Sequence, residues 1–186
     1  MRLTRRSCVF AVLAGLAVAL LAPIQALATT NNNESARYMV EMEVPNTARA
    51  ANGDTVTMTG MGELSLHPKA FTGAGQFTMH NGGTTINGTW SGVELLAFQP
   101  YGCGVVQGNP LPANFCGGFM LARVALTPST GPTMSGILRV VCIIGDVPGQ
   151  YFVSKNATEG INLDVPGVDN YNQQVEPSMN IFIRMA

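Results

Sequence analysis

Charged side chains are scarce in this sequence. Of its 186 residues only 11% are Asp, Glu, Lys or Arg, and the formal net charge is -1. Proteins that bind nucleic acid carry a basic stripe or patch, so we expect no nucleic-acid partner. The low charge does not indicate disorder, because 46% of the residues are hydrophobic and a chain of that composition can bury a core.

Histidine is also rare, and the residue groups of common catalytic sites are missing. His67 and His80 are the two histidines, whereas a zinc site needs three or four His, Cys or carboxylate ligands. The sequence contains no G-x-S-x-G motif and no recognisable Ser/His/Asp set. The acidic residues between 146 and 169 do not have the spacing of a calcium loop. We therefore expect no metal and no cofactor, and we assign no catalytic residue.

The sequence has one long apolar run, residues 8–22. Three arginines precede it and Ala26-Leu27-Ala28 follows it, which is the order of a secretory signal peptide. The run is shorter than the roughly 20 residues of a membrane span, so the mature chain has no predicted span. The Arg5-Arg6 pair leaves both general and twin-arginine export open. The sequence therefore predicts a secreted or periplasmic protein. Its chain is divided into a signal peptide (1–28), a flexible segment (29–36) and one β domain (37–186).

Three cysteines remain after cleavage: Cys103, Cys116 and Cys142. An oxidising compartment favours one disulfide and one leftover thiol. A Cys103–Cys142 bond would tie a long loop to a strand, whereas a Cys103–Cys116 bond would only close that loop. We favour Cys103–Cys142. The leftover thiol is expected to be buried rather than catalytic, because no histidine lies near it in the sequence to act as a base.

No segment has a helical period, and alternation of apolar and polar residues recurs throughout. In the first such segment Tyr38, Val40, Met42 and Val44 fall on one face, and the charged residues Arg37, Glu41 and Glu43 fall on the other. The pattern predicts an all-β fold, an antiparallel meander of about eight strands that forms a small calycin-like barrel or a closed sandwich. The predicted strands are residues 37–44, 54–66, 71–80, 84–98, 118–127, 134–144, 160–165 and 178–185.

The pattern T-G-x-G-x-apolar occurs twice, at residues 59–64 and 72–77. A phosphate-binding glycine loop opens a helix, but a hairpin follows the second repeat, so we interpret these glycines as structural. A two-residue turn at Asn81-Gly82 would place Gly73 opposite Trp90, and a turn at residues 67–70 would place Gly60 opposite Phe77. The glycines would then make room for the aromatic rings and allow the sheet to bend.

The loop of residues 99–118 is long for a connection in a compact domain, and connections of that length are often functional. It could cover the mouth of a pocket or simply close one end of the core. Arginines in apolar strands either face solvent, paired with an acid such as Glu94, or point inward to an anionic ligand. The pocket candidates are Tyr101, Phe115, Trp90, Arg123 and Arg139.

A set of short motifs runs along most of the mature chain: residues 73–77 (G-A-G-Q-F), 88–90 (G-T-W), 98–104 (F-Q-P-Y-G-C-G), 111–115 (L-P-A-N-F) and 141–142 (V-C). With these motifs the chain resembles a group of small secreted β proteins without an assigned function. The resemblance implies that Cys103 and Cys142 belong to the common core, which supports their pairing, and that Cys116 departs from the pattern. It transfers no catalytic or binding residue.

These observations favour a non-enzymatic function. A small β-barrel can hold one small ligand, so the main expectation is either a binder of a small apolar molecule or a structural and interaction module. One alternative is a barrel enzyme, an isomerase or cyclase that orients a small apolar substrate. Another is a surface adhesion subunit, which would use an exposed strand edge.

Overall fold

The computed structural model describes residues 36–146, 159–175 and 177–186, all of which fall in one compact unit, residues 32–186. The predicted signal peptide and most of the flexible segment lie outside the described residues, so both stay predictions. The strands are β1 (Arg37–Arg49), β2 (Thr55–Leu66), β3 (Lys69–Asn81), β4 (Thr84–Cys103), β5 (Val105–Val106), β6 (Asn109–Pro110), β7 (Phe115–Pro128), β8 (Met134–Cys142), β9 (Gly160–Val165), β10 (Asp169–Tyr171), β11 (Gln173–Val175) and β12 (Asn180–Met185).

Side-chain alternation accounts for the long strands. On β1 the side chains of Tyr38, Val40 and Met42 are buried and those of Arg37 and Glu43 are exposed, as expected for a strand with one face on the core. All eight predicted strands are present, with ends displaced by a few residues. The other four strands are two or three residues long, too short to show a period in the sequence.

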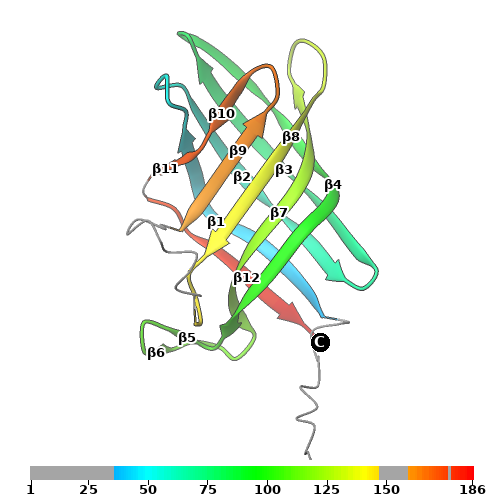
Figure 1. Ribbon diagram of the computed structural model, residues 1–186, viewed down its shortest axis with the longest axis vertical. Coiled ribbons are helices and arrows are strands. Elements are labelled where there is room, and N and C mark those ends of the chain that lie inside the picture. The colour runs from blue at the N-terminus through cyan, green and yellow to red at the C-terminus, as the bar shows by residue number, and fades with distance from the viewer. Residues whose placement is uncertain (1–35, 147–158, 176) are drawn as a thin grey trace, which may run out of the picture. The chain divides into compact units, whose positions relative to one another are not determined.

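The main sheet has ten antiparallel strands, and part of it closes into a ring (Figure 1). Its order is β10-β9-β8-β7-β12-β1-β2-β3-β4, with β11 paired to β1 and β4 paired back to β7. One edge of β7 pairs with β4. The other edge pairs with β12 at Phe115 and Cys116 and with β8 over residues 118–126. The predicted all-β antiparallel fold is confirmed, and the sheet is partly ring-like.

The core-facing side chains of the sheet are large and closely packed. Three aromatic rings from strands far apart in the sequence meet there: the centroid of the Phe98 ring is 4.8 Å from that of Tyr38 and 5.1 Å from that of Phe182. Burial of apolar side chains of this size is the main favourable term in folding. The largest fully buried side chains are Tyr38, Tyr171, Phe77, Phe182, Met58, Leu64, Met79, Leu95, Met120, Leu126, Leu138 and Ile161.

The predicted registers of two hairpins are wrong by two residues. The β3–β4 turn is Gly82-Gly83, both with positive φ, so Trp90 lies opposite Gly75 and not opposite Gly73. The β2–β3 turn is His67-Pro68, so Gly60 lies opposite Gly75 and not Phe77. A shift of two residues keeps every side chain on its face of the sheet. The interpretation of the glycines as structural is therefore retained with different partners.

The tightest of these contacts surrounds Trp90. A Cβ atom on Gly75 would lie 1.8 Å from the carbonyl oxygen of Thr59 and 2.5 Å from Nε1 of Trp90. The indole Nε1 donates a hydrogen bond to that same carbonyl, with an N···O distance of 2.9 Å. The pair of glycines at positions 60 and 75 thus forms the space in which the indole ring lies.

Candidate functional site

Strands β3 and β4 separate partway along their length, and the gap between them forms a hollow. Their ladder ends at the pair Ala74 and Ser91. Beyond that pair β4 follows β7, with register shifts between Gly92 and Glu94 and between Leu95 and Ala97. Such bulges bend a strand, and here the bend directs β4 away from β3. We call the resulting space the β3–β4 hollow; it measures about 330 Å³ and is lined by Leu66, His67, Lys69, Leu95, Leu96, Ala97 and Phe98.

The wall of the β3–β4 hollow is mostly apolar and continues into the core. Leu95 is 2% exposed, and the partly buried Leu66 and Phe98 pack against the core cluster. Phe98 contacts both Tyr38 and Phe182, so its ring packs against two core side chains. A mostly apolar wall of this kind is typical of small-molecule sites.

One side chain crosses the gap. The ammonium group of Lys69 donates a hydrogen bond to the carbonyl oxygen of Leu96, with an N···O distance of 2.7 Å. If the ladder of Ala74 and Ser91 continued for five more residues, Lys69 and Leu96 would be direct partners. The lysine side chain therefore donates to a carbonyl that lies beyond the end of the β3–β4 ladder.

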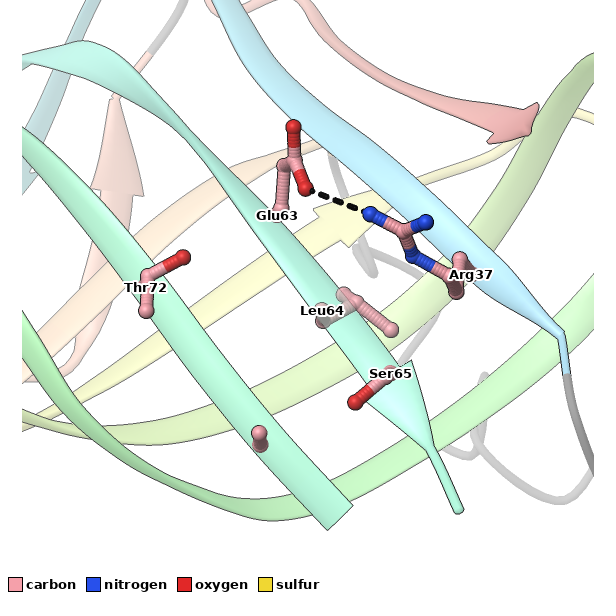
Figure 2. A pocket seen from close by; sticks show the side chains of 6 residues that line it. Arg37, Glu63, Leu64, Ser65 and Thr72 are labelled. Atoms are coloured by element: carbon pink, nitrogen blue, oxygen red, sulfur yellow. Dashed lines mark hydrogen bonds and ion pairs between the residues drawn. The ribbon is translucent and has the colours of Figure 1, made fainter. Parts of the chain in front are cut away.

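Two further hollows lie on the outer face of β1, β2 and β3. The larger, which we call the outer hollow, measures about 460 Å³ and contains Met39, Met61, Glu63, Thr72 and Ala74 together with two glycines. A smaller one of about 100 Å³ adjoins it, where Arg37 and Glu63 form an ion pair across β1 and β2 (Figure 2). Here the ladder is continuous, and the side chain of Met61 is 55% exposed. The outer hollow is thus a depression between surface side chains and does not reach the core.

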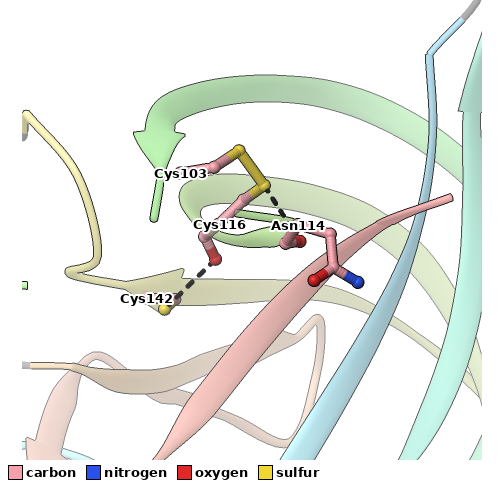
Figure 3. The surroundings of a disulfide bond; sticks show 4 residues. All are labelled: Cys103, Asn114, Cys116 and Cys142. Carbon is pink, nitrogen blue, oxygen red and sulfur yellow. Dashed lines mark hydrogen bonds between the residues drawn. A yellow bond between two sulfur atoms is a disulfide. The ribbon is translucent and has the colours of Figure 1, made fainter. Parts of the chain in front are cut away.

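The disulfide prediction is wrong. The bond joins Cys103 to Cys116, whose Cα atoms are 3.9 Å apart, and Cys142 is a buried free thiol (Figure 3). The physical reason is register, because Cys103 and Cys116 are direct partners of the β4–β7 ladder, whereas Cys142 lies opposite Gly118. The Cys142 thiol donates a hydrogen bond to the Cys116 carbonyl, with an S···O distance of 3.6 Å. The expectation of one buried leftover thiol therefore applies to Cys142.

The disulfide closes the base of a small hairpin formed by β5 and β6. Backbone amides of Gly145 and Asp146 donate to the carbonyls of Val105 and Tyr101, which fixes this hairpin to the segment after β8. Loop residues 99–118 are thus largely regular structure, since β4 extends to Cys103 and β7 begins at Phe115.

The five predicted pocket residues lie on different faces of the sheet. Trp90 and Tyr101 are buried and Phe115 is half-buried. Arg123 is on the outer face and pairs with Glu94 at 3.3 Å, which is one of the pairings expected from the sequence. Arg139 is also on the outer face, where its guanidinium carbon lies 5.2 Å from the centre of the Phe119 ring. The five do not surround one space, and none of them lines the three hollows described above.

The residues of the β3–β4 hollow were not identified from the sequence. One signal was present: the adjacent Leu95 and Leu96 interrupt the alternation of the strand predicted at residues 84–98. Two consecutive apolar residues in an alternating strand indicate a bulge. Lys69 had no signal beyond its position after the predicted turn.

Within residues 36–146, 159–175 and 177–186, no group of three or more His, Cys, Asp or Glu side chains could hold a metal ion. The same part of the chain has no helix of the length and apolarity that a membrane crossing requires. In comparisons with known proteins, the chain matches no protein-family model, no curated protein and no solved structure. The resemblance to small secreted β proteins therefore stays a prediction.

Proposed function

We propose that this protein is an exported, non-enzymatic binding module that holds a small, mostly apolar molecule in the β3–β4 hollow. The observation that carries the proposal is the interruption of the sheet between β3 and β4, which exposes Leu66, Leu96 and Phe98 in one concave space. Its volume of about 330 Å³ lies at the lower end of the range for small-molecule sites, roughly 300–1,000 Å³.

The composition of the hollow supports binding rather than catalysis. Five of its seven lining residues are apolar, and the other two, His67 and Lys69, are exposed at its rim. No carboxylate lines it to act with them as an acid–base pair. The Cys103–Cys116 disulfide is compatible with an exported protein.

The test is a titration of the folded protein with octanol, followed by NMR of leucine methyl groups. We expect saturable shifts of the Leu66, Leu95 and Leu96 methyl signals, and none for Leu138, which is buried on β8. An Ala97→Phe variant would place a ring in the hollow and abolish these shifts. Ala125→Phe is the matched control, because Ala125 is a half-buried alanine of β7 that does not line the hollow. Shifts that never saturate, or that are equal at Leu138, would refute the proposal.

A further inference from the structure

The electrostatics of the β3–β4 hollow point to a ligand class. We propose that its ligand is an apolar acid, a chain with a single carboxylate head, and that Lys69 binds the carboxylate at the rim. This inference rests on the proposed function and names its ligand more narrowly.

The charge of Lys69 is not compensated by a neighbouring acid. None of the seven residues that line the hollow is Asp or Glu. Lys69 belongs neither to the Arg37–Glu63 ion pair nor to the Arg123–Glu94 ion pair. A ligand with a negative head would therefore meet an available positive charge.

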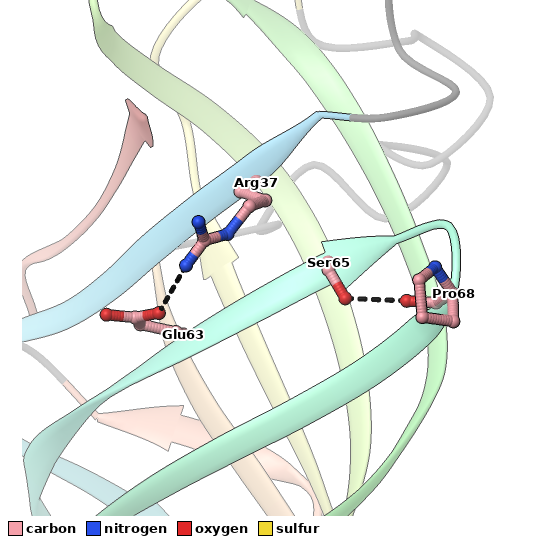
Figure 4. A network of polar contacts seen from close by, with 4 residues as sticks. All are labelled: Arg37, Glu63, Ser65 and Pro68. Carbon is pink, nitrogen blue, oxygen red and sulfur yellow. Dashed lines mark hydrogen bonds and ion pairs between the residues drawn. The ribbon is translucent and has the colours of Figure 1, made fainter. Parts of the chain in front are cut away.

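The two acids on the strands beside the hollow are already occupied. Glu63 of β2 accepts a hydrogen bond from Arg37 at 3.1 Å (Figure 4). Glu94 of β4 accepts one from Arg123 at 3.3 Å. Because each carboxylate is neutralised by its own arginine, neither opposes an anion bound at Lys69.

Two features place the ammonium group of Lys69. Its hydrogen bond to the Leu96 carbonyl uses one of the three N–H donors of a lysine and leaves two for a ligand. The turn that precedes Lys69 is also held, since the hydroxyl of Ser65 donates to the Pro68 carbonyl at 2.6 Å (Figure 4). The hydrogen bond therefore places the ammonium group beside Leu96, which lines the hollow.

These features match an amphipathic acid better than a neutral or cationic molecule. The alkyl chain would lie against Leu66, Leu95 and Phe98, and the carboxylate would remain at the rim beside Lys69, partly in water. An exposed ion pair of this type stabilises a complex by up to about 1 kcal/mol. The expected preference for an acid over the alcohol of equal length is therefore roughly two- to fivefold in Kd.

The experiment compares octanoate, octanol and octylammonium by the same leucine-methyl NMR titration. In the wild-type protein octanoate should bind most tightly, octanol less tightly and octylammonium most weakly. Lys69→Met keeps an apolar side chain of similar length without the charge, and should remove the preference, so that octanoate and octanol bind with equal affinity. Lys69→Arg keeps the charge and should retain the preference. The fluorescence of the single tryptophan, Trp90, checks that each variant is folded.

The possible failures are distinguishable. If octanoate and octanol bind equally to the wild-type protein, or if Lys69→Met retains the preference for octanoate, the assignment of the carboxylate and of Lys69 is overturned and the proposed function remains. If none of the three probes gives a saturable shift, the proposed function fails and this inference fails with it. Added salt offers an internal check, because it should weaken octanoate binding and leave octanol binding unchanged.

Discussion

At the scale of single residues, Gly75 determines whether the Trp90 side chain can occupy the core. A methyl group at position 75 would overlap both the Thr59 carbonyl and the indole nitrogen, and the Trp90–Thr59 hydrogen bond would be lost. We predict that Gly75→Ala lowers the free energy of unfolding by about 2–4 kcal/mol, the sum of overpacking and one lost hydrogen bond. Urea unfolding followed by Trp90 fluorescence measures it.

The neighbouring residue provides the control for this prediction. Ala74 is exposed on the opposite face of the same strand, so Ala74→Ser should change the stability by less than about 0.5 kcal/mol. If Gly75→Ala were as mild as Ala74→Ser, the glycine pair would not be the reason that the indole ring fits, and the structural interpretation of the repeat would be wrong.

Cys142 makes the stability of the protein depend on pH in the alkaline range. Burial, and after it the charge of Glu159, raises the pKa of this thiol from 9.0 to about 12. The unfolded chain therefore loses the thiol proton first. The contribution of the protonated Cys142 thiol to the free energy of unfolding is complete below about pH 9. As the pH rises toward 12 this contribution is lost, by up to about 1.4 kcal/mol per pH unit.

The test compares wild type with Cys142→Ala by urea unfolding at a series of pH values. Removing the thiol leaves a cavity that costs the same at every pH, so the slope is the informative quantity. Between about pH 9 and 10 we expect stability to fall in the wild type and to stay level in the variant. Above pH 10 both should fall, because burial also raises the pKa values of Tyr38 and Tyr171. Parallel slopes from pH 9 upward would show that Cys142 makes no such contribution.

At the scale of strands, the sequence predicts which residues form strands better than it predicts which strands pair. Alternation reports the face of each side chain, which is why all eight long strands and the face of Trp90 were predicted correctly. It does not distinguish registers that differ by two residues, because both keep the same faces. The choice between Asn81-Gly82 and Gly82-Gly83 as the turn was therefore undetermined by periodicity, and the structure selects the second.

The same limit explains the wrong disulfide and the missed hollow. Whether Cys103 meets Cys116 or Cys142 depends on which residues are partners across β4 and β7, a long-range property that no local pattern carries. The β3–β4 hollow depends on two bulges in β4 and on its pairing with β7. Of these, only the bulge at Leu95 and Leu96 left a trace in the sequence.

At the scale of the whole sheet, some strands are joined by backbone pairing and others only by side-chain hydrogen bonds. Near the start of β7, β12 and β7 pair directly at two positions. At the β9–β10 edge, the hydroxyl of Tyr171 donates to Oδ1 of Asn81 at 2.6 Å. There Nδ2 of Asn52 also donates to Asp169 at 2.7 Å. These contacts link β10 to the β1–β2 turn and to the end of β3.

The Tyr171 hydroxyl should therefore stabilise one region more than the rest of the sheet. We predict that Tyr171→Phe lowers the free energy of unfolding by about 0.5–1.5 kcal/mol. The substitution should also accelerate amide hydrogen exchange more in β9 and β10 than in β2 and β3. Thr78→Val is the matched control, because it removes a hydrogen bond between exposed side chains, Thr78 and Asn87, within an intact ladder. It should change neither quantity measurably. If Tyr171→Phe instead accelerates exchange equally in β2, β3, β9 and β10, this edge opens only when the whole sheet unfolds. The side-chain bridge would then add to global stability without acting as a local closure.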